Sequence, residues 1–356
     1  MLRKWRLILV IISSFFIYNS FAYGNTLKVV VFGDSLSDIG YQDLLKNYIP
    51  WPNIPNTNIP KAPTFTTPGG KIWAQYLGDR LNIPMTANNT GYLPVTKTAS
   101  GELKGTDYAA GGATTTCTGF TIAINGNAIY SPPPIGPLRP FKHCKDHAIE
   151  QYNQIDQYLR AHKHDARSKT IYIFWGGANN ILFAMSHNKS KMLISAVQAA
   201  NDIAYDVRYL YVRGARKFII MGMPDLGLTP AATNNGQQSK NLAASLVASI
   251  YNKRLQGQLK NLQSLLPHLK YQWVDVAALM NKVVQNHYLM NGFNIVPIAN
   301  VSQSACQYAD KVSAINCLPK GTGNYFFEDR VHPTSIVHQA LADKVYQAVL
   351  KLRYAL

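Results

Sequence analysis

The stretch of residues 29–35, an apolar run that stops at a glycine and is followed by a serine, constrains the fold of this chain most. The run from Val29 to Phe32 is apolar and mostly β-branched, which is typical of a strand buried on both faces. Gly33 ends the run and permits a sharp turn, because a residue without Cβ tolerates a positive φ. Ser35 is therefore expected at the carboxyl end of a buried strand, where ligands bind in open α/β sheets.

Two interpretations of Ser35 remain open on these residues alone. A serine held at such a turn can act as a nucleophile, but serines beside Gly and Asp are also common as turn or helix-capping residues. A nucleophile needs a base, an orienting acid and oxyanion donors elsewhere in the chain.

Strand-like apolar runs alternate with amphipathic segments along the rest of the chain. Further strands are predicted at residues 170–175, 217–222 and 271–276. Helices are predicted at residues 71–81, 148–159, 192–214, 242–266 and 335–352, with a short helix reaching residue 286. This alternation predicts a mostly parallel sheet with helices on both faces. Because no repeat and no Gly/Ser-rich linker interrupts it, we expect residues 23–356 to form a single domain.

Residues 1–22 have the pattern of a secretory signal peptide. Arg3, Lys4 and Arg6 precede an apolar core at residues 7–17, and small residues follow at the end of the segment. The core is short for a bilayer span, although a retained membrane anchor is the alternative. We therefore expect a secreted or periplasmic protein.

The chain is strongly basic, with a formal net charge of +17. Removal of Arg3, Lys4 and Arg6 with the signal peptide leaves +14. A basic surface favours contact with anionic lipid headgroups. Because the basic residues are scattered and no nucleic-acid-binding motif accompanies them, we do not expect a nucleic-acid partner.

Four cysteines, Cys117, Cys144, Cys306 and Cys317, fit an oxidising compartment. Of the three possible pairings we favour Cys117 with Cys144 and Cys306 with Cys317, and free buried thiols are the alternative. Neither spacing resembles a zinc site, so no metal is expected.

A histidine and an acid near the C-terminus supply a candidate base and its partner. Asp329 precedes His332 by three residues, and Pro333 holds the loop. The carboxylate can fold back onto the imidazole, fix its tautomer and stabilise the imidazolium. A helix-capping Asp beside a surface His is the alternative.

Two further turns offer donors for a developing oxyanion. Gly111 and Gly112 can bring backbone N–H groups close to a ligand, and Asn179 can donate from its side-chain amide. Ordinary tight turns are the alternative for both segments. A proline-rich stretch at residues 47–70 carries Phe65, which could help to wall an apolar pocket or pack as part of a surface loop.

Taken in order along the chain, these residues resemble the blocks that define the GDSL-type SGNH hydrolases. The matching segments are Gly33-Asp34-Ser35-Leu36-Ser37-Asp38, Gly112, Gly177-x-Asn179 and Asp329-x-x-His332. Connecting segments at residues 108–114, 223–230 and 326–334 look like the secreted bacterial branch that contains phospholipases A, lysophospholipases A and glycerophospholipid:cholesterol acyltransferases. The likeness covers essentially the whole chain after residue 22.

The resemblance implies a three-layer αβα, flavodoxin-like fold and ester hydrolysis without a metal or cofactor. It assigns Ser35 as nucleophile, His332 as base and Asp329 as its partner. It assigns the oxyanion hole to the N–H groups of Ser35 and Gly112 and the side chain of Asn179. It also implies lysophospholipid or phospholipid substrates, contact with a membrane surface and a possible sterol acceptor, and we expect a monomer.

Two positions depart from the family pattern, since Asp107 replaces the usual Asn and Asn180 replaces the usual Asp. These departures question how the neighbouring loops are supported. A short-chain or carbohydrate esterase is an alternative function. A non-catalytic lipid- or surface-binding module is an alternative of another class.

Overall fold

The computed structural model describes residues 27–40, 65–67, 69–88, 105–115, 122–124, 128–130, 135–137, 153–292, 294–309, 314–317 and 324–354. The predicted signal peptide lies outside the described residues.

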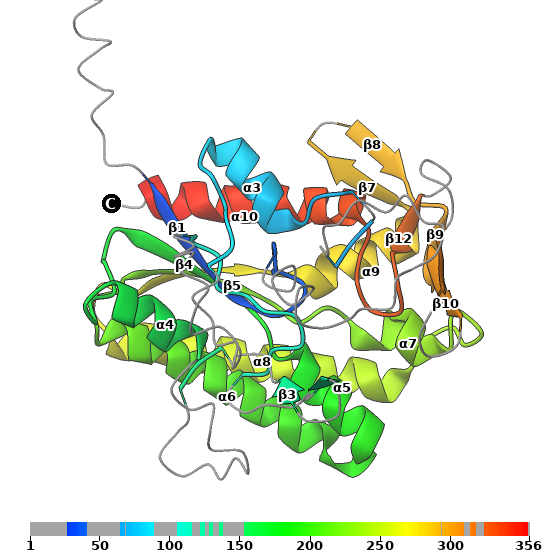
Figure 1. The fold of residues 1–356 in the computed structure, drawn as a ribbon, viewed down its shortest axis with the longest axis horizontal. Helices are drawn as coiled ribbons and strands as arrows, with labels where there is room; N and C mark the ends of the chain where they lie inside the picture. Colours follow the sequence, from blue (N-terminus) through cyan, green and yellow to red (C-terminus); the bar gives the residue numbers. More distant parts are fainter. Residues whose placement is uncertain are drawn as a thin grey trace, which may run out of the picture.

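The centre of the fold is a four-stranded parallel sheet (Figure 1). Its strands, in the order β1-β4-β5-β6, are β1 (Lys28–Gly33), β4 (Thr170–Trp175), β5 (Lys217–Met221) and β6 (Lys270–Val274). Every pairing is parallel, so the carboxyl ends of all four strands lie at one edge of the sheet. The four strands predicted from apolar runs are therefore confirmed, with small differences at their ends.

Helices cover both faces of the sheet and make three layers (Figure 1). One face carries α3 (Trp73–Leu81), α9 (Val276–Asn286) and α10 (Ser335–Tyr354). The other face carries α4 (Gln154–Ala161), α5 (Ala178–His187), α6 (Met192–Tyr211) and α8 (Leu242–Leu265). The predicted αβα architecture is thus present. In the part of the chain that the structure describes, no helix is long and apolar enough to cross a membrane.

The side chains of β1 explain why this run has no polar alternation. Val29 and Val31 join the apolar cluster on the side of α3 and α10, whereas Val30 and Phe32 join the cluster on the side of α4, α6 and α8. Successive residues of a strand point to opposite faces, so a strand between two helical layers must be apolar throughout.

Several short elements were not predicted from the sequence. They are η2 (Lys189–Lys191), η3 (Leu226–Leu228), α7 (Pro230–Thr233), β2 (Ile122–Ile124), β3 (Ala128–Tyr130), β7 (Tyr288–Asn291), β8 (Asn294–Pro297), β9 (Asn300–Ser304), β10 (Cys306–Ala309), β11 (Ala314–Cys317) and β12 (Tyr325–Phe327). The strands form the pairs β2–β3, β7–β8, β9–β12 and β10–β11. The pairing of β12 with β9 fixes the segment that leads into the Asp329 loop.

Candidate active site

The turn after β1 presents Ser35 at the carboxyl edge of the sheet. The carboxylate of Asp34 accepts the Leu36 N–H at 3.0 Å, which closes a tight turn around the serine. A Cβ on Gly33 would lie 2.5 Å from the backbone oxygen of Trp175, so only glycine fits there. Gly33 is not among the residues with positive φ. The glycine is required by this close approach, and not by the left-handed conformation that the sequence had indicated.

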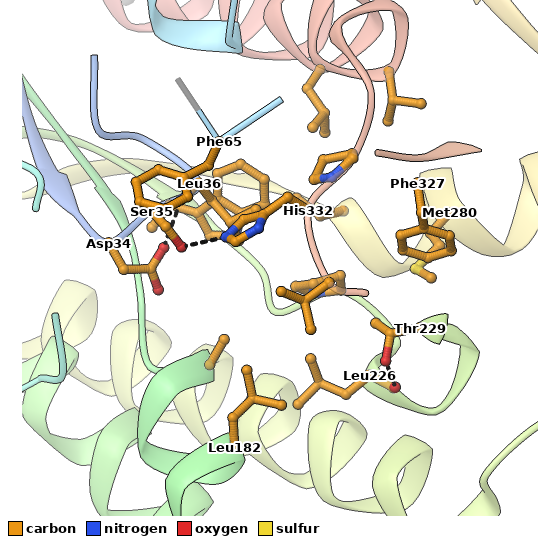
Figure 2. A pocket seen from close by; sticks show the side chains of 18 of the residues that line it. Asp34, Ser35, Leu36, Phe65, Leu182, Leu226, Thr229, Met280, Phe327 and His332 are labelled. Atoms are coloured by element: carbon orange, nitrogen blue, oxygen red, sulfur yellow. Dashed lines mark hydrogen bonds between the residues drawn. The ribbon is translucent and has the colours of Figure 1, made fainter. Parts of the chain in front are cut away.

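The loop after β12 brings a histidine and an acid to Ser35. His332 Nε2 lies 2.8 Å from Ser35 Oγ (Figure 2). His332 Nδ1 lies 2.6 Å from Asp329 Oδ2. The other oxygen of Asp329 accepts the N–H groups of Val331 and His332 at 2.8 and 2.7 Å. The carboxylate is therefore held by the loop that it organises. This is the arrangement that a base-assisted serine nucleophile requires.

The pKa values of His332 and Asp329 are shifted in the directions that proton transfer by His332 requires. Burial lowers the pKa of His332, but the carboxylate of Asp329, with a smaller contribution from Asp34, outweighs burial and raises it above its usual value. Burial raises the pKa of Asp329, but the His332 imidazole and two backbone N–H groups outweigh burial and lower it. Asp329 therefore stays ionised while His332 takes up and releases a proton.

The glycine turn at residues 111–112 lies beside the serine turn. Gly112 has a φ of +80°, a conformation that side-chain-bearing residues rarely adopt. The Gly111 N–H donates to Asp38 Oδ2 at 2.8 Å, which ties this turn to the segment that follows Ser35. Gly112 lines the same cavity as Ser35. Its N–H is therefore a candidate oxyanion donor.

Asn179 lies in the first turn of α5, directly after β4. Its side-chain Nδ2 donates to the backbone oxygen of Ala113 at 2.9 Å, and the residue lines the cavity beside Ser35. A carboxamide carries two N–H groups, so one can orient the side chain while the other serves a ligand. Gly177, with φ of +101°, permits the turn, and a Cβ there would lie 2.8 Å from the ring of Tyr251. The sequence had placed Asn179 in a turn, and the structure places it at a helix start.

A buried carboxylic acid lies directly beside the nucleophile. Asp34 is 1% exposed, and burial raises the pKa of its carboxyl to about 7, against the lowering effects of the Leu36 N–H and His332. Among the residues that the structure describes, its Oδ2 has no hydrogen-bond partner. A carboxyl group deprived of water retains its proton to higher pH. The sequence motif contained Asp34, but its residue type did not reveal this ionisation state.

An apolar cavity of about 310 Å³ opens at Ser35 and His332 (Figure 2). Its apolar lining includes Leu36, Leu182, Leu226, Val276, Leu279, Met280, Phe326, Phe327, Val337 and Leu341. Phe65 also lines it, and its ring centroid lies 4.9 Å from that of His332. Of the two roles that the sequence left open for Phe65, the contact favours the pocket wall. The volume and lining are those of a site for an apolar ligand.

A second histidine, His338, follows the pocket residue Val337 on α10, and no sequence pattern points to it. It is fully buried on α10, and burial, with repulsion from His332, lowers its pKa to about 3. It is therefore neutral at any pH at which His332 titrates. No cluster of three or more His, Cys, Asp or Glu side chains suited to a metal ion occurs among the described residues.

The two positions that depart from the family pattern both support their loops. Asp107 Oδ1 accepts the Ala109 N–H at 2.9 Å, within the segment that leads to the glycine turn. Asn180 Oδ1 accepts the Thr115 N–H at 3.1 Å, and its Nδ2 donates to Thr115 Oγ1 at 3.2 Å. Each substituted side chain therefore holds backbone next to a candidate oxyanion donor.

Only one of the four cysteines has a described side chain. Cys306 is part of a disulfide, and it faces Cys317 across the antiparallel pair β10–β11. The Cys306 N–H donates to the backbone oxygen of Glu328 at 2.7 Å, next to Asp329. Cys117 and Cys144 lie outside the described residues, so their pairing stays a prediction.

The comparison with protein families gives a match over nearly the whole described fold. The family model of the GDSL-like lipases/acylhydrolases matches residues 29–345. The chain belongs to this family. Membership of this family implies that the chain is a carboxylic-ester hydrolase. The mostly parallel, three-layer architecture agrees with this membership.

Similar proteins include several plant enzymes of the same family. One GDSL esterase/lipase of Arabidopsis thaliana is 25% identical over 341 residues, covering 92% of each chain. A second is 24% identical over 374 residues, covering 98% of this chain and 94% of the relative. A third is 23% identical over 342 residues, covering 88% and 84%. These relatives support ester hydrolysis. They do not confirm the resemblance to the bacterial phospholipase branch.

Proposed function

We propose that this GDSL family member is a secreted serine esterase that hydrolyses fatty-acyl esters of lysophospholipids and phospholipids. The observation that carries the proposal is the apolar cavity of about 310 Å³ that opens directly at Ser35 Oγ. A cavity of this kind suits a hydrocarbon chain, whereas a carbohydrate would need polar partners along its length.

The reaction begins at the hydrogen bond between Ser35 and His332. His332 Nε2 accepts the serine proton as Ser35 Oγ attacks the acyl carbonyl, and Asp329 stabilises the imidazolium that forms. The imidazolium then gives its proton to the leaving alcohol. An acyl-enzyme remains, and His332 removes a proton from the water that hydrolyses it.

Three hydrogen-bond donors stabilise the negative charge of the tetrahedral intermediate. They are the N–H groups of Ser35 and Gly112 and the second N–H of the Asn179 amide. Donors held in place before the reaction lower the barrier because they need no reorganisation when charge develops. The Ala113 contact of Asn179 and the left-handed φ of Gly112 support their assignment to this role.

Two further features support the lipid assignment. The basic net charge, +14 without residues 1–22, favours an anionic membrane surface. The sequence blocks resemble the bacterial branch of phospholipases A, lysophospholipases A and glycerophospholipid:cholesterol acyltransferases. A sterol hydroxyl could replace water in the second step, so we include acyl transfer to a sterol as a second outcome.

The deciding experiment compares the wild type with Ser35→Ala on lysophosphatidylcholine, phosphatidylcholine and nitrophenyl esters of increasing chain length. Free fatty acid and sterol ester are scored separately, with and without a sterol acceptor. We expect activity on long-chain esters that Ser35→Ala abolishes. Activity confined to the shortest esters or to acetylated sugars would favour the alternative esterases, and activity surviving in Ser35→Ala would overturn the mechanism.

The proposal includes export, a single domain and a monomeric enzyme without a metal or cofactor. The signal-peptide pattern at residues 1–22 and the disulfide at Cys306 support an oxidising destination. N-terminal sequencing of the exported protein would test cleavage near Ala22. Light scattering of the same sample would test the monomer.

A further inference from the structure

The outer edge of β1 is paired with a segment that leads to the oxyanion turn. Val31 N–H donates to the Thr106 oxygen at 2.9 Å, and Tyr108 N–H donates back to the Val31 oxygen at 2.9 Å. Ala110 N–H then donates to the Gly33 oxygen at 3.2 Å. This is a parallel ladder, and its next regular bond would join Gly33 N–H to the backbone oxygen of Tyr108.

A glutamine side chain occupies that place in the ladder. Gly33 N–H donates to Gln154 Oε1 at 2.9 Å, and Gln154 Nε2 donates to the Gly33 oxygen at 2.8 Å. Gln154 comes from the start of α4, 121 residues away, and it is fully buried. A carboxamide offers one acceptor and one donor side by side, as a peptide group does. The side chain therefore takes the place of one backbone hydrogen bond of the ladder, at the point where β1 becomes the serine turn.

The backbone around Gln154 holds the amide in place. The Asn153 side chain caps α4 by accepting the Asp156 N–H at 2.9 Å, and the Ile155 N–H donates to the Ile135 oxygen at 3.1 Å. The glutamine thus lies between two anchored residues at the first turn of a helix. Such anchoring limits the freedom of the side chain before substrate arrives.

We propose that Gln154 is a positioning residue that sets the serine turn and the oxyanion turn relative to each other. The Gly33 oxygen receives both Gln154 Nε2 and Ala110 N–H, so the two turns meet at a single carbonyl group. Ser35 follows that carbonyl by two residues, and Gly112 follows Ala110 by two. This inference rests on the proposed function, because it assigns these two residues to nucleophile and oxyanion hole.

A second clamp of the same design serves as a control. Asn252 Oδ1 accepts the Met223 N–H at 2.7 Å, and Asn252 Nδ2 donates to the Met223 oxygen at 2.8 Å. This clamp holds the chain after β5 and touches neither the serine turn nor the oxyanion turn. It therefore reports what the loss of a buried amide clamp does when neither the serine turn nor the oxyanion turn is involved.

The test is Gln154→Glu, assayed across pH. A protonated glutamic acid can accept from Gly33 N–H and donate to the Gly33 oxygen, as glutamine does. An ionised glutamate cannot donate, and its negative charge faces the Gly33 oxygen. Burial raises the pKa of a carboxyl group, so the acid stays neutral at low pH. We expect the ratio of variant to wild-type kcat to be highest at acid pH and to fall roughly 10- to 100-fold as pH rises, with little change in KM.

Two further variants separate positioning from folding. Gln154→Met keeps the length of the side chain but neither hydrogen bond, so its kcat ratio should be low at every pH. In Asn252→Asp, the melting temperature should fall as pH rises. The ratio of its kcat to that of the wild type should not fall. Gln157→Glu adds a charge to a half-buried position of the same helix and should behave as wild type. Because glutamic acid at position 154 is neutral at acid pH, the variant is purified there and then transferred, and activity should return when the pH is lowered again.

A kcat ratio for Gln154→Glu that stays flat with pH, in a protein that remains folded, would overturn the inference. A fall of the same size in Asn252→Asp would also overturn it, because the effect would then be general to buried clamps. Ser35→Ala tests the proposed function separately from the positioning role of Gln154. If it retains hydrolysis, the proposed function fails; if it is inactive while the Gln154→Glu ratio is flat, only the positioning role fails.

Discussion

His332 Nε2 lies 2.8 Å from Ser35 Oγ, although the two residues are 297 positions apart in the chain. The serine lies in the turn after the first strand of the sheet, and the histidine lies in the loop that precedes the last helix. Parallel pairing brings the end of β1 to the edge where that loop lies. The contact therefore depends on the fold as a whole and on a local acid, Asp329, that orients the imidazole.

We expect Asp329→Asn to reduce kcat/KM roughly 10⁴-fold, the cost of losing the corresponding acid in a serine triad. The wild-type rate should rise with pH as His332 loses its proton, with a midpoint above 6.5 because Asp329 raises the pKa of His332 against the effect of burial. Without the carboxylate, burial dominates and lowers this pKa. The midpoint of the residual activity should therefore move to lower pH.

The measurement is kcat/KM against pH for both proteins, with circular dichroism as a check on folding. An unmoved midpoint in Asp329→Asn would show that the carboxylate does not set the ionisation of His332. Asp79→Asn, at an exposed acid on α3 that is paired with Lys71, should keep the wild-type profile.

Asn179→Ala should reduce kcat by roughly 10²- to 10³-fold and leave KM nearly unchanged, since an oxyanion donor acts mainly on the transition state. Asn179→Asp should lose as much, because an ionised carboxylate at this position accepts hydrogen bonds and repels the oxyanion. Steady-state kinetics on one soluble ester measure both effects. A variant that raised KM alone would assign Asn179 to substrate binding instead.

Asp34→Asn should stabilise the protein at neutral and alkaline pH. Burial raises the pKa of Asp34 from 3.8 to about 7, so the folded state keeps a proton that the unfolded state has lost between these values. The wild type therefore loses stability as pH rises from about 4 to 7, on the order of 4 kcal/mol in total, and the loss is constant above. Asparagine cannot ionise and can still accept the Leu36 N–H.

Melting temperatures of wild type and Asp34→Asn between pH 4 and pH 9 test this expectation. The difference should be small at pH 4, grow up to about pH 7 and then level off. A difference that does not vary with pH would show that Asp34 is ionised in the folded protein throughout. Asp79→Asn supplies the comparison for an exposed acid.

Strands β1 and β4 could be predicted because both of their faces are buried, and the main helices could be predicted because one face of each is apolar. Residues 170–175 are buried at every position, so the strand is visible as an uninterrupted apolar run. The site residues could be found because the motif blocks place chemically distinct residue types at fixed positions after strands.

Other parts depend on contacts that leave no periodic pattern. The β9–β12 pair joins short, partly polar segments, Asn300–Ser304 and Tyr325–Phe327, with an irregular register. α5 begins at the motif residues themselves, so its start looks like a turn. Gln154 is a single polar residue whose partner lies 121 positions away, and no spacing rule connects them.

The acyl pocket gives a prediction on chain length. Met280 is 1% exposed on α9 and lies with Phe327 across the pocket from Ser35 (Figure 2). A tryptophan there would occupy space that a long acyl chain needs. We expect Met280→Trp to lower kcat/KM for sixteen-carbon esters by about 10-fold or more and to leave four-carbon esters unaffected, because the reacting groups are untouched.

A matched variant on the same helix controls for overpacking. Val283 is buried on α9 but does not line the cavity, so Val283→Leu should lower the melting temperature without changing the ratio of long-chain to short-chain activity. Met280→Ala should have the opposite effect to Met280→Trp and favour longer chains. If all three variants kept the wild-type chain-length profile, the acyl chain would have to bind outside this cavity, and the lipid assignment would lose the observation that carries it.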